Sequence, residues 1–102
     1  MKDIKIIVKR VGEAPTIDYI PNTLDALKKL VDGYIETVTL AQNIVVICNR
    51  DGKLIGLPYN CKVCNLKFCG TIVFVGVDET GEEFADCPLT LEDAALYGFD
   101  QK

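Results

Sequence analysis

The sequence contains no histidine, no serine and no tryptophan. Histidine is the side chain whose unperturbed pKa lies nearest to neutral pH, so acid–base catalysis would depend on a carboxylate, Lys, Tyr or Cys with a shifted pKa. Without histidine, neither a Ser–His nor a Cys–His nucleophile pair can be assembled within one chain. Glycine-rich nucleotide-binding motifs and the H-E-x-x-H zinc motif are also missing. We therefore expect a protein that is not an enzyme.

Long apolar segments are absent as well. The most apolar run, Ile44–Cys48, falls far short of the ~20 residues that a membrane-spanning helix needs. Lys5 and Lys9 interrupt the first strand-like segment, so no signal peptide is visible. The five cysteines are an odd number, and without an export signal they favour reduced thiols over a disulfide framework. These features predict a cytoplasmic protein that does not enter a membrane.

The composition is that of an ordinary globular domain. The chain has 102 residues, of which 49% are hydrophobic and 25% are charged. This length suits one domain with a single core, and no linker, repeat or low-complexity segment divides it. We expect a single domain over residues 1–102.

Hydrophobic periodicity predicts a sheet and one main helix. The helix begins at Asn22 or Thr23, carries apolar residues at helical spacing, and ends at Gly33 as the left-handed residue. Because Ile44–Cys48 is apolar on both faces, we expect this strand to be central and covered on both sides. The other predicted strands are Ile4–Val11, Thr16–Ile20, Tyr34–Leu40, Gly70–Val77 and a short one near Phe84.

Turn signals complete the expected fold. Asp51-Gly52 predicts a tight turn that makes a central hairpin, with the chain returning through Leu54 to Leu57. Pro58–Cys69 reads as an irregular loop, and Thr90–Asp93 has the form of a capping box before a short helix that closes at Gly98. The fold class is α+β, with a mostly antiparallel sheet of about five to seven strands, one main helix packed on it and a short C-terminal helix.

The cysteines form the sharpest chemical pattern. A C-x2-C pair lets two thiolates reach one tetrahedral ion, and two further cysteines offer the remaining ligands of a zinc site. Against this, structural zinc sites usually contain two closely spaced pairs, and cysteine is commonly buried as a small hydrophobic residue. We therefore expect no cofactor and keep zinc as the alternative. The candidate ligands are Cys61, Cys64, Cys69 and Cys87.

Charge is distributed unevenly along the chain. Residues 1–77 carry 10 basic and 7 acidic side chains, whereas residues 78–101 carry 8 acidic side chains and no Lys or Arg. Such a segment is suited to a basic partner surface, although a solvated loop and helix face is the commoner explanation. The candidate contact residues are Asp78, Glu79, Glu82, Glu83, Asp86, Glu92 and Asp93.

Two further groups of residues are candidate sites. Asn49, Arg50, Asp51, Lys53 and Asn60 surround the expected hairpin, and turn formation is a better explanation for them than ligand binding. Cations and aromatic residues in the same region would suit a nucleic acid strand, but the overall net charge of −4 and the lack of a dense basic stripe argue against phosphate binding. The cations are Arg50, Lys53, Lys62 and Lys67, with Tyr59 and Phe68 as the aromatic residues.

Four ordered blocks carry a resemblance to a known family, namely Leu30–Glu36, Cys48–Lys53, Gly56–Asn60 and Gly70–Gly76. Over roughly Ile4 to Val77 the chain resembles the family called domain of unknown function 3846. The resemblance implies a small protein of bacteria, phages or mobile elements, in a family with no settled activity. It implies no family pattern for the cysteine-bearing segment Cys61–Cys69.

These observations together favour a non-catalytic interaction protein, of phage or mobile-element origin, that binds a host protein or a small ligand. An exposed sheet edge or the acidic segment is the expected contact surface. A second copy of the chain is a further candidate partner, whereas membrane and nucleic acid are not expected partners. The alternative from another class is a small zinc-stabilised module with a cysteine-rich loop that contacts nucleic acid.

Overall fold

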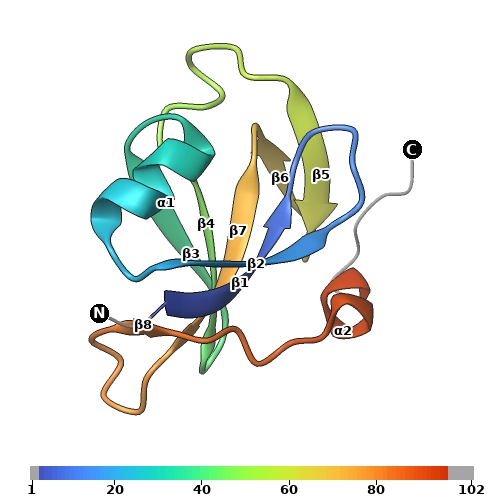
Figure 1. Ribbon diagram of the computed structural model, residues 1–102. Coiled ribbons are helices and arrows are strands. Elements are labelled where there is room, and N and C mark those ends of the chain that lie inside the picture. Colours follow the sequence, from blue (N-terminus) through green and yellow to red (C-terminus); the bar gives the residue numbers. More distant parts are fainter. Residues whose placement is uncertain (1–2, 97–102) are drawn as a thin grey trace.

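The computed structural model describes residues 3–96 (Figure 1). The chain forms eight strands and two helices within these residues. In chain order they are β1 (Asp3–Lys9), β2 (Thr16–Pro21), α1 (Leu24–Val31), β3 (Ile35–Ala41), β4 (Ile44–Asn49), β5 (Tyr59–Val63), β6 (Leu66–Cys69), β7 (Ile72–Val77), β8 (Phe84–Ala85) and α2 (Leu91–Ala95).

Six strands form one antiparallel sheet, and this confirms the predicted α+β class. The strand order is β2-β1-β7-β4-β3, and β8 pairs with β7 beside this path. The hairpins β1–β2 and β3–β4 are local, whereas β7 inserts between β1 and β4. The β5–β6 hairpin is a separate two-stranded sheet. The edges of the main sheet are therefore β2 and β3.

Helix α1 covers one face of the sheet. The Thr23 hydroxyl accepts a hydrogen bond from the Ala26 amide at 3.2 Å, which caps the first turn as the sequence predicts. The helix buries Leu27 and Val31 against the sheet. The residues of the sheet in this cluster are Ile4, Ile6, Val8, Val45, Ile47, Val73 and Val75. Apolar residues at helical spacing in α1 thus pack against alternate residues of three neighbouring strands, β1, β7 and β4.

The end of α1 differs from its prediction. The left-handed residue is Asp32, with φ of 62°, and not Gly33. Asp tolerates this conformation better than most residues because its short polar side chain bonds locally. Gly33 is needed for space instead, since a Cβ at this position would lie 2.6 Å from Nδ2 of Asn49. The sequence signal was correct about the boundary and wrong about the residue that makes it.

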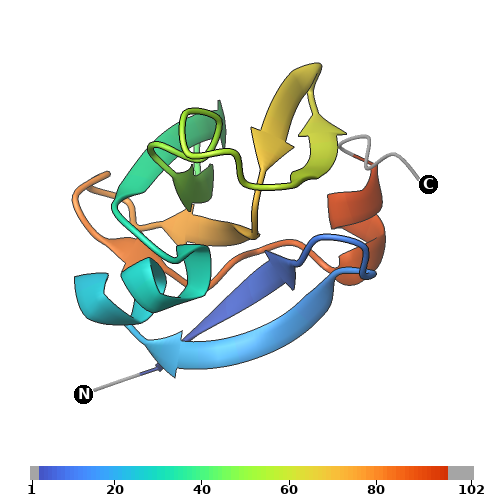
Figure 2. The ribbon, with the colours of Figure 1, turned by 90° about the horizontal axis from the view of Figure 1, so that it is seen from above.

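The opposite face is covered by the β5–β6 hairpin and by the segment that leads into α2. Figure 2 shows α1 and the β5–β6 hairpin on opposite sides of β7. From the covering segments, Cys61, Val63, Phe68, Cys87, Leu89 and Ala94 are buried against Ile7, Ile44, Val46, Cys48, Ile72 and Phe74 of the sheet. All six residues of β4 are buried, so the prediction that this strand is covered on both faces is confirmed.

Two predicted segments are wrong. After β4 the chain does not return as a strand through Leu54, because residues 50–56 form consecutive turns and both edges of β4 are already paired, with β3 and β7. The expected hairpin at Asp51-Gly52 is therefore absent. The segment Pro58–Cys69 is not an irregular loop, since it contains the β5–β6 hairpin.

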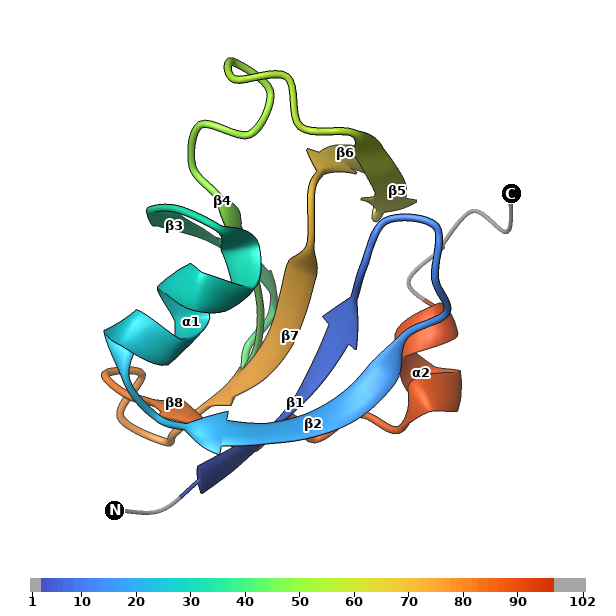
Figure 3. The same ribbon diagram turned by 45° about the horizontal axis from the view of Figure 1, so that its top comes forward.

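The last helix begins as predicted. Thr90 and Asp93 form a capping box, in which each side chain accepts from the backbone amide of the other residue. Figure 3 shows α2 near the β1–β2 hairpin and far from α1. The predicted end of this helix, at Tyr97 and Gly98, lies outside the described residues. Neither helix within residues 3–96 has the length and apolar character needed to traverse a bilayer.

Candidate functional site

The four cysteines proposed as zinc ligands are placed in different environments. Cys61 is buried on β5 and Cys87 is buried beneath the sheet, whereas Cys64 is exposed in the β5–β6 turn and Cys69 is partly exposed at the end of β6. Within residues 3–96, no three His, Cys, Asp or Glu side chains are grouped as metal ligands would be. The structure therefore does not bring this candidate set together.

Three of the seven acidic candidates have local structural roles. Asp86 accepts a hydrogen bond from the Lys5 amide at 2.8 Å, and this joins the chain after β8 to β1. Asp93 belongs to the capping box of α2. Asp78 closes the turn between β7 and β8. The remaining four, Glu79, Glu82, Glu83 and Glu92, are exposed.

Asp78 organises its turn through one carboxylate oxygen. Its Oδ1 accepts from the Thr80 hydroxyl at 2.7 Å and from the amides of Glu82 and Glu83 at 3.2 and 3.4 Å. The Thr80 hydrogen bond, followed by those from backbone amides, lowers the pKa of the Asp78 carboxyl below its ordinary value. The hydrogen bonds of the Asp78 carboxylate therefore stabilise the turn between β7 and β8.

The polar set after β4 is also mainly structural. Asn49 donates from Nδ2 to the carbonyls of Val31 and Asp32 at 3.0 and 3.1 Å, and its Oδ1 accepts from the Asp51 amide at 2.8 Å. Its side chain thus satisfies the end of α1 and the start of the following turns at once. The turn-forming interpretation of Asn49 is confirmed.

Asn60 has a comparable role on the other side of the molecule. Its Nδ2 donates to the carbonyls of Lys9 and Gly70 at 2.7 and 2.8 Å, and its Oδ1 accepts from Nζ of Lys9 at 3.0 Å. Nζ of Lys9 also donates to the Arg10 carbonyl at 3.1 Å. Lys9 and Asn60 are only 7% and 8% exposed, so these bonds satisfy polar groups inside the protein. They attach the β5–β6 hairpin to the end of β1.

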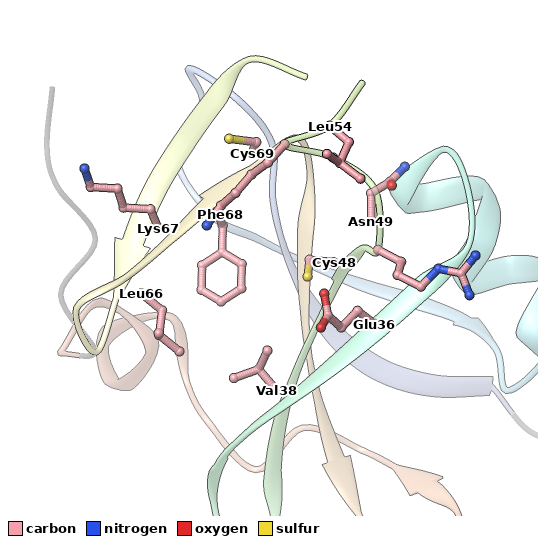
Figure 4. A pocket seen from close by; sticks show the side chains of 12 residues that line it. Glu36, Val38, Cys48, Asn49, Leu54, Leu66, Lys67, Phe68 and Cys69 are labelled. Atoms are coloured by element: carbon pink, nitrogen blue, oxygen red, sulfur yellow. The ribbon is translucent and has the colours of Figure 1, made fainter. Parts of the chain in front are cut away.

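A cleft that the sequence did not predict lies between the edge of the main sheet and the small hairpin. We call it the β3–β6 cleft, and its volume is about 210 Å³. Val38, Cys48 and Phe68 form its apolar interior, and Leu66 closes the side next to β6 (Figure 4). The other lining residues are Glu36, Asn49, Arg50, Gly52, Lys53, Leu54, Lys67 and Cys69.

Exposed apolar side chains stand at the rim of this cleft. Leu54, in the turns after β4, is 88% exposed, and Leu66 is 46% exposed. Neither residue packs into one of the two core clusters. An apolar interior that continues onto exposed leucines is typical of a surface that another molecule covers.

The rim is also basic, although the chain as a whole is acidic. Arg50, Lys53 and Lys67 line the cleft together with one carboxylate, Glu36. Arg50 is partly engaged, because its guanidinium lies 4.9 Å from the centre of the Tyr34 ring and 3.8 Å from the Asp51 carboxylate. Lys53 and Lys67 make no ion pair with another described residue. Both lysines add positive charge near the cleft, and the ammonium group of Lys67 points away from the cleft interior (Figure 4).

Cys48 is the thiol inside the cleft. Burial, together with the nearby Glu36 charge and opposed by Lys53, raises the pKa of the Cys48 thiol to about 11. A thiol with this pKa is protonated at neutral pH and is a poor nucleophile. Cys48 thus contributes a small apolar surface to the cleft and not a reactive thiolate.

The basic residues singled out in the sequence are partly brought together. Arg50, Lys53 and Lys67 share the cleft, whereas Lys62 does not line it. Phe68 is buried, with 5% exposure, so its ring face is not open for a base to stack on. The cleft itself had no sequence signal, because it is assembled from three segments, at residues 36–38, 48–54 and 66–69, that meet only in the folded chain.

Comparison with protein families places the chain in a group without an assigned activity. A family model described as domain of unknown function (DUF3846) matches residues 4–97 of this chain. Neither the curated proteins nor the solved structures gave a significant match.

Proposed function

Since this chain belongs to the DUF3846 family, which carries no assigned activity, we propose its function from the geometry of the β3–β6 cleft: the protein binds a partner and does not turn over a substrate. The cleft receives an apolar group of that partner. The observation that carries the proposal is an apolar interior with unpaired lysines at its rim, on a chain whose net charge is −4.

The size of the cleft supports this proposal. Pockets that enclose a small-molecule substrate usually measure roughly 300–1,000 Å³, whereas this cleft measures about 210 Å³. Such a volume suits one apolar side chain or a small fragment. Interfaces between proteins often depend on an anchoring side chain of this kind, which is seated in a pocket and surrounded by weaker contacts.

The chemistry of the cleft supports binding over catalysis. Cys48 is held as a thiol, and Glu36 is the one carboxylate among the described residues that line the cleft. Neither a nucleophile paired with a base nor a pair of carboxylates is available there for acid–base work. Lys53 and Lys67 instead attract negative charge, which orients a partner and raises its rate of association.

The wider setting of the proposal comes from the sequence. A host protein is the partner we expect, with a small ligand as the alternative, and a cytoplasmic location and a phage or mobile-element origin belong to the same proposal. The exposed carboxylates after β7 are available for a second contact on the same partner.

A fragment titration followed by NMR tests the proposal. The ¹⁵N-labelled protein is titrated with a set of small apolar carboxylic acids and short peptides, and the amide shifts are mapped. We expect the shifts to cluster at Val38, Cys48 and Phe68. The variant Val38→Phe fills the cleft and should remove binding, whereas Ile17→Phe, an exposed apolar position on the opposite edge strand, should not.

The result that contradicts the proposal is equally specific. Shifts that map to β2 or that leave out Val38, Cys48 and Phe68, or binding that survives Val38→Phe, would place the contact surface elsewhere. Both variants are first compared with the unmodified protein by NMR, so that a change in folding is not mistaken for a loss of binding.

A further inference from the structure

Strand β3 presents an unpaired backbone edge. It is the last strand of the main sheet and pairs only with β4 among the described residues. The Arg50 amide donates to the Tyr34 carbonyl at 2.8 Å, so residues in phase with Tyr34, namely Glu36 and Val38, are the hydrogen-bonded partners of β4. The N–H and C=O groups of the alternate residues, Ile35, Thr37 and Thr39, therefore point away from the sheet.

This edge has little protection against another strand. Natural sheets shield their edges with proline, lysine or inward-pointing charge. Strand β2, at the other edge, ends in Pro21 and contains Asp18, whose carboxylate accepts from the Tyr19 amide at 2.8 Å. Strand β3 has neither proline nor lysine, and its protection is limited to one inward-pointing charge, Glu36 in the β3–β6 cleft, and to the register shift between Thr39 and Ala41.

A hollow flanks β3 on each face. On the side of Glu36 and Val38 lies the β3–β6 cleft, and on the side of Thr37 and Thr39 lies a second hollow of about 360 Å³. The second hollow is also lined by Glu82, Glu83, Phe84, Val45, Gln42, Val77 and Gly81. Successive side chains of a strand point to opposite faces. A strand added beside β3 would therefore place its side chains alternately in the cleft and in this hollow.

The two hollows carry opposite charge. The cleft is lined by Arg50, Lys53 and Lys67 against the single carboxylate of Glu36, whereas the second hollow has exposed Glu82 and Glu83. A partner strand is complementary to both only if acidic and basic side chains alternate along it. The apolar interior beside Val38 favours one apolar side chain on the acidic face of this partner strand.

We propose that the partner is an extended peptide segment that pairs with the edge of β3, with one apolar side chain in the β3–β6 cleft, acidic side chains on that same face, and Lys or Arg on the opposite face. This inference rests on the proposed function, since it names the chemistry of the ligand for the same cleft. Backbone hydrogen bonds to Ile35, Thr37 and Thr39 supply affinity, and the alternating side chains supply specificity.

Charge complementarity favours this peptide over a second copy of β3. The sequence of β3 is IETVTLA, which contains no Lys or Arg to meet Glu82 and Glu83. Antiparallel pairing of two β3 strands about Val38 would also place Glu36 beside Leu40. The edge of a second copy is therefore a poor match for the two hollows.

Two peptides of identical composition test the proposal. The first, Thr-Glu-Lys-Leu-Lys-Glu-Thr, carries Leu and Glu on one face and Lys on the other. The second, Thr-Lys-Glu-Leu-Glu-Lys-Thr, carries Leu and Lys on one face and Glu on the other. Both are symmetric, so strand direction does not matter, and both have the same net charge. Their affinities are measured by fluorescence anisotropy with labelled peptide and full-length protein.

We expect the first peptide to bind about tenfold more tightly than the second, because four exposed charge pairs each contribute a modest factor. The variant Lys53→Glu/Lys67→Glu should abolish this preference, because both hollows are then acidic, and Val38→Phe should weaken both peptides. Methylation of alternate backbone amides of the first peptide gives two versions. One should lose binding, since its amides face β3, and the other should keep it.

Other outcomes overturn the inference. Equal affinity of the two peptides, or two N-methylated versions that both bind as the parent does, would exclude strand addition. If apolar fragments still bind in the cleft in the NMR titration, the proposed function survives that result. A concentration-dependent dimer that Thr37→Pro abolishes would assign the edge to a second copy, and this also overturns the peptide proposal.

Discussion

Replacing Asn60 by alanine should destabilise the protein strongly, because its side chain is buried and hydrogen-bonded. The substitution removes two hydrogen bonds from Nδ2, to the carbonyls of Lys9 and Gly70, and one from Nζ of Lys9 to Oδ1. The ammonium group of Lys9, itself only 7% exposed, would keep a single protein partner, the Arg10 carbonyl. The substitution thus leaves buried polar groups without their hydrogen-bond partners.

The magnitude follows from the three bonds. Each neutral bond contributes about 1 kcal/mol and the bond from the ammonium group about 1.5–3 kcal/mol, so we expect a loss of about 4 kcal/mol in the free energy of unfolding. Domains of this size are typically stable by only about 5–15 kcal/mol. The variant Asn60→Ala should therefore unfold at a markedly lower urea concentration.

Urea denaturation of four proteins measures the effect. Besides the unmodified chain, these are Asn60→Ala, Lys9→Met and the double variant. Because the two residues share a hydrogen bond, the double-mutant cycle should give a coupling of about 1.5–3 kcal/mol. Gln42→Ala, an exposed polar position, should change stability by less than about 0.5 kcal/mol.

The reasoning would be refuted by a loss below about 1 kcal/mol in Asn60→Ala, or by additive effects of the two single variants. The first result would mean that water replaces the side chain at little cost, and the second that the bond between Lys9 and Asn60 contributes no coupling energy. The β5–β6 hairpin would then be held by apolar contacts alone.

Three further predictions concern the core and the thiols. Gly76→Ala should lower the free energy of unfolding by about 1–3 kcal/mol in urea denaturation, because its Cβ would overlap the Asp86 carbonyl oxygen. The pKa of Cys48 is raised from 9.0 to about 11, so the stabilisation from its protonated thiol is complete below pH 9 and is lost as the pH rises towards 11. Cys48→Val should flatten the free energy of unfolding between pH 9 and 11, and an unchanged pH profile would contradict the raised pKa. Maleimide should modify exposed Cys64 before buried Cys61 in the folded protein, as mass spectrometry of digests can show.

Apolar patterning was a reliable guide to the elements that pack against the sheet. The run Ile44–Cys48 has no polar face, and the strand is indeed covered by α1 on one side and by the β5–β6 hairpin on the other. The helix boundary at Thr23 and the capping box at Thr90 were also visible, because caps depend on residues that are near in sequence.

Pairing between distant segments was not visible. Asp51-Gly52 does lie in turns, and the Gly52 amide donates to the Asn49 carbonyl at 3.2 Å. The expected returning strand fails because the free edge of β4 is taken by β7, which comes much later in the chain. A local turn signal does not show that a strand from a distant part of the sequence will pair with this edge instead.

The β5–β6 hairpin was missed for a different reason. A register shift between Tyr59 and Cys61 places Asn60 and Cys61 on the interior in succession, so the alternation that marks a strand is broken. One signal was present, since Cys64 and Asn65 both have positive φ in the connecting turn and Asn is common at such positions. The β3–β6 cleft depends on this hairpin and was therefore missed with it.

The position of β7 has a consequence for synthesis of the protein. The two local hairpins can form as soon as they leave the ribosome, but only β7 joins them into one sheet. The Lys5 carbonyl accepts its hydrogen bond from the Cys87 amide, which is synthesised later still. Until then a nascent chain exposes the β1 and β4 edges, which are apolar and complementary to any stray strand. Translation that stalls before residue 77 should therefore yield aggregating or chaperone-bound fragments, since no earlier stopping point completes the sheet.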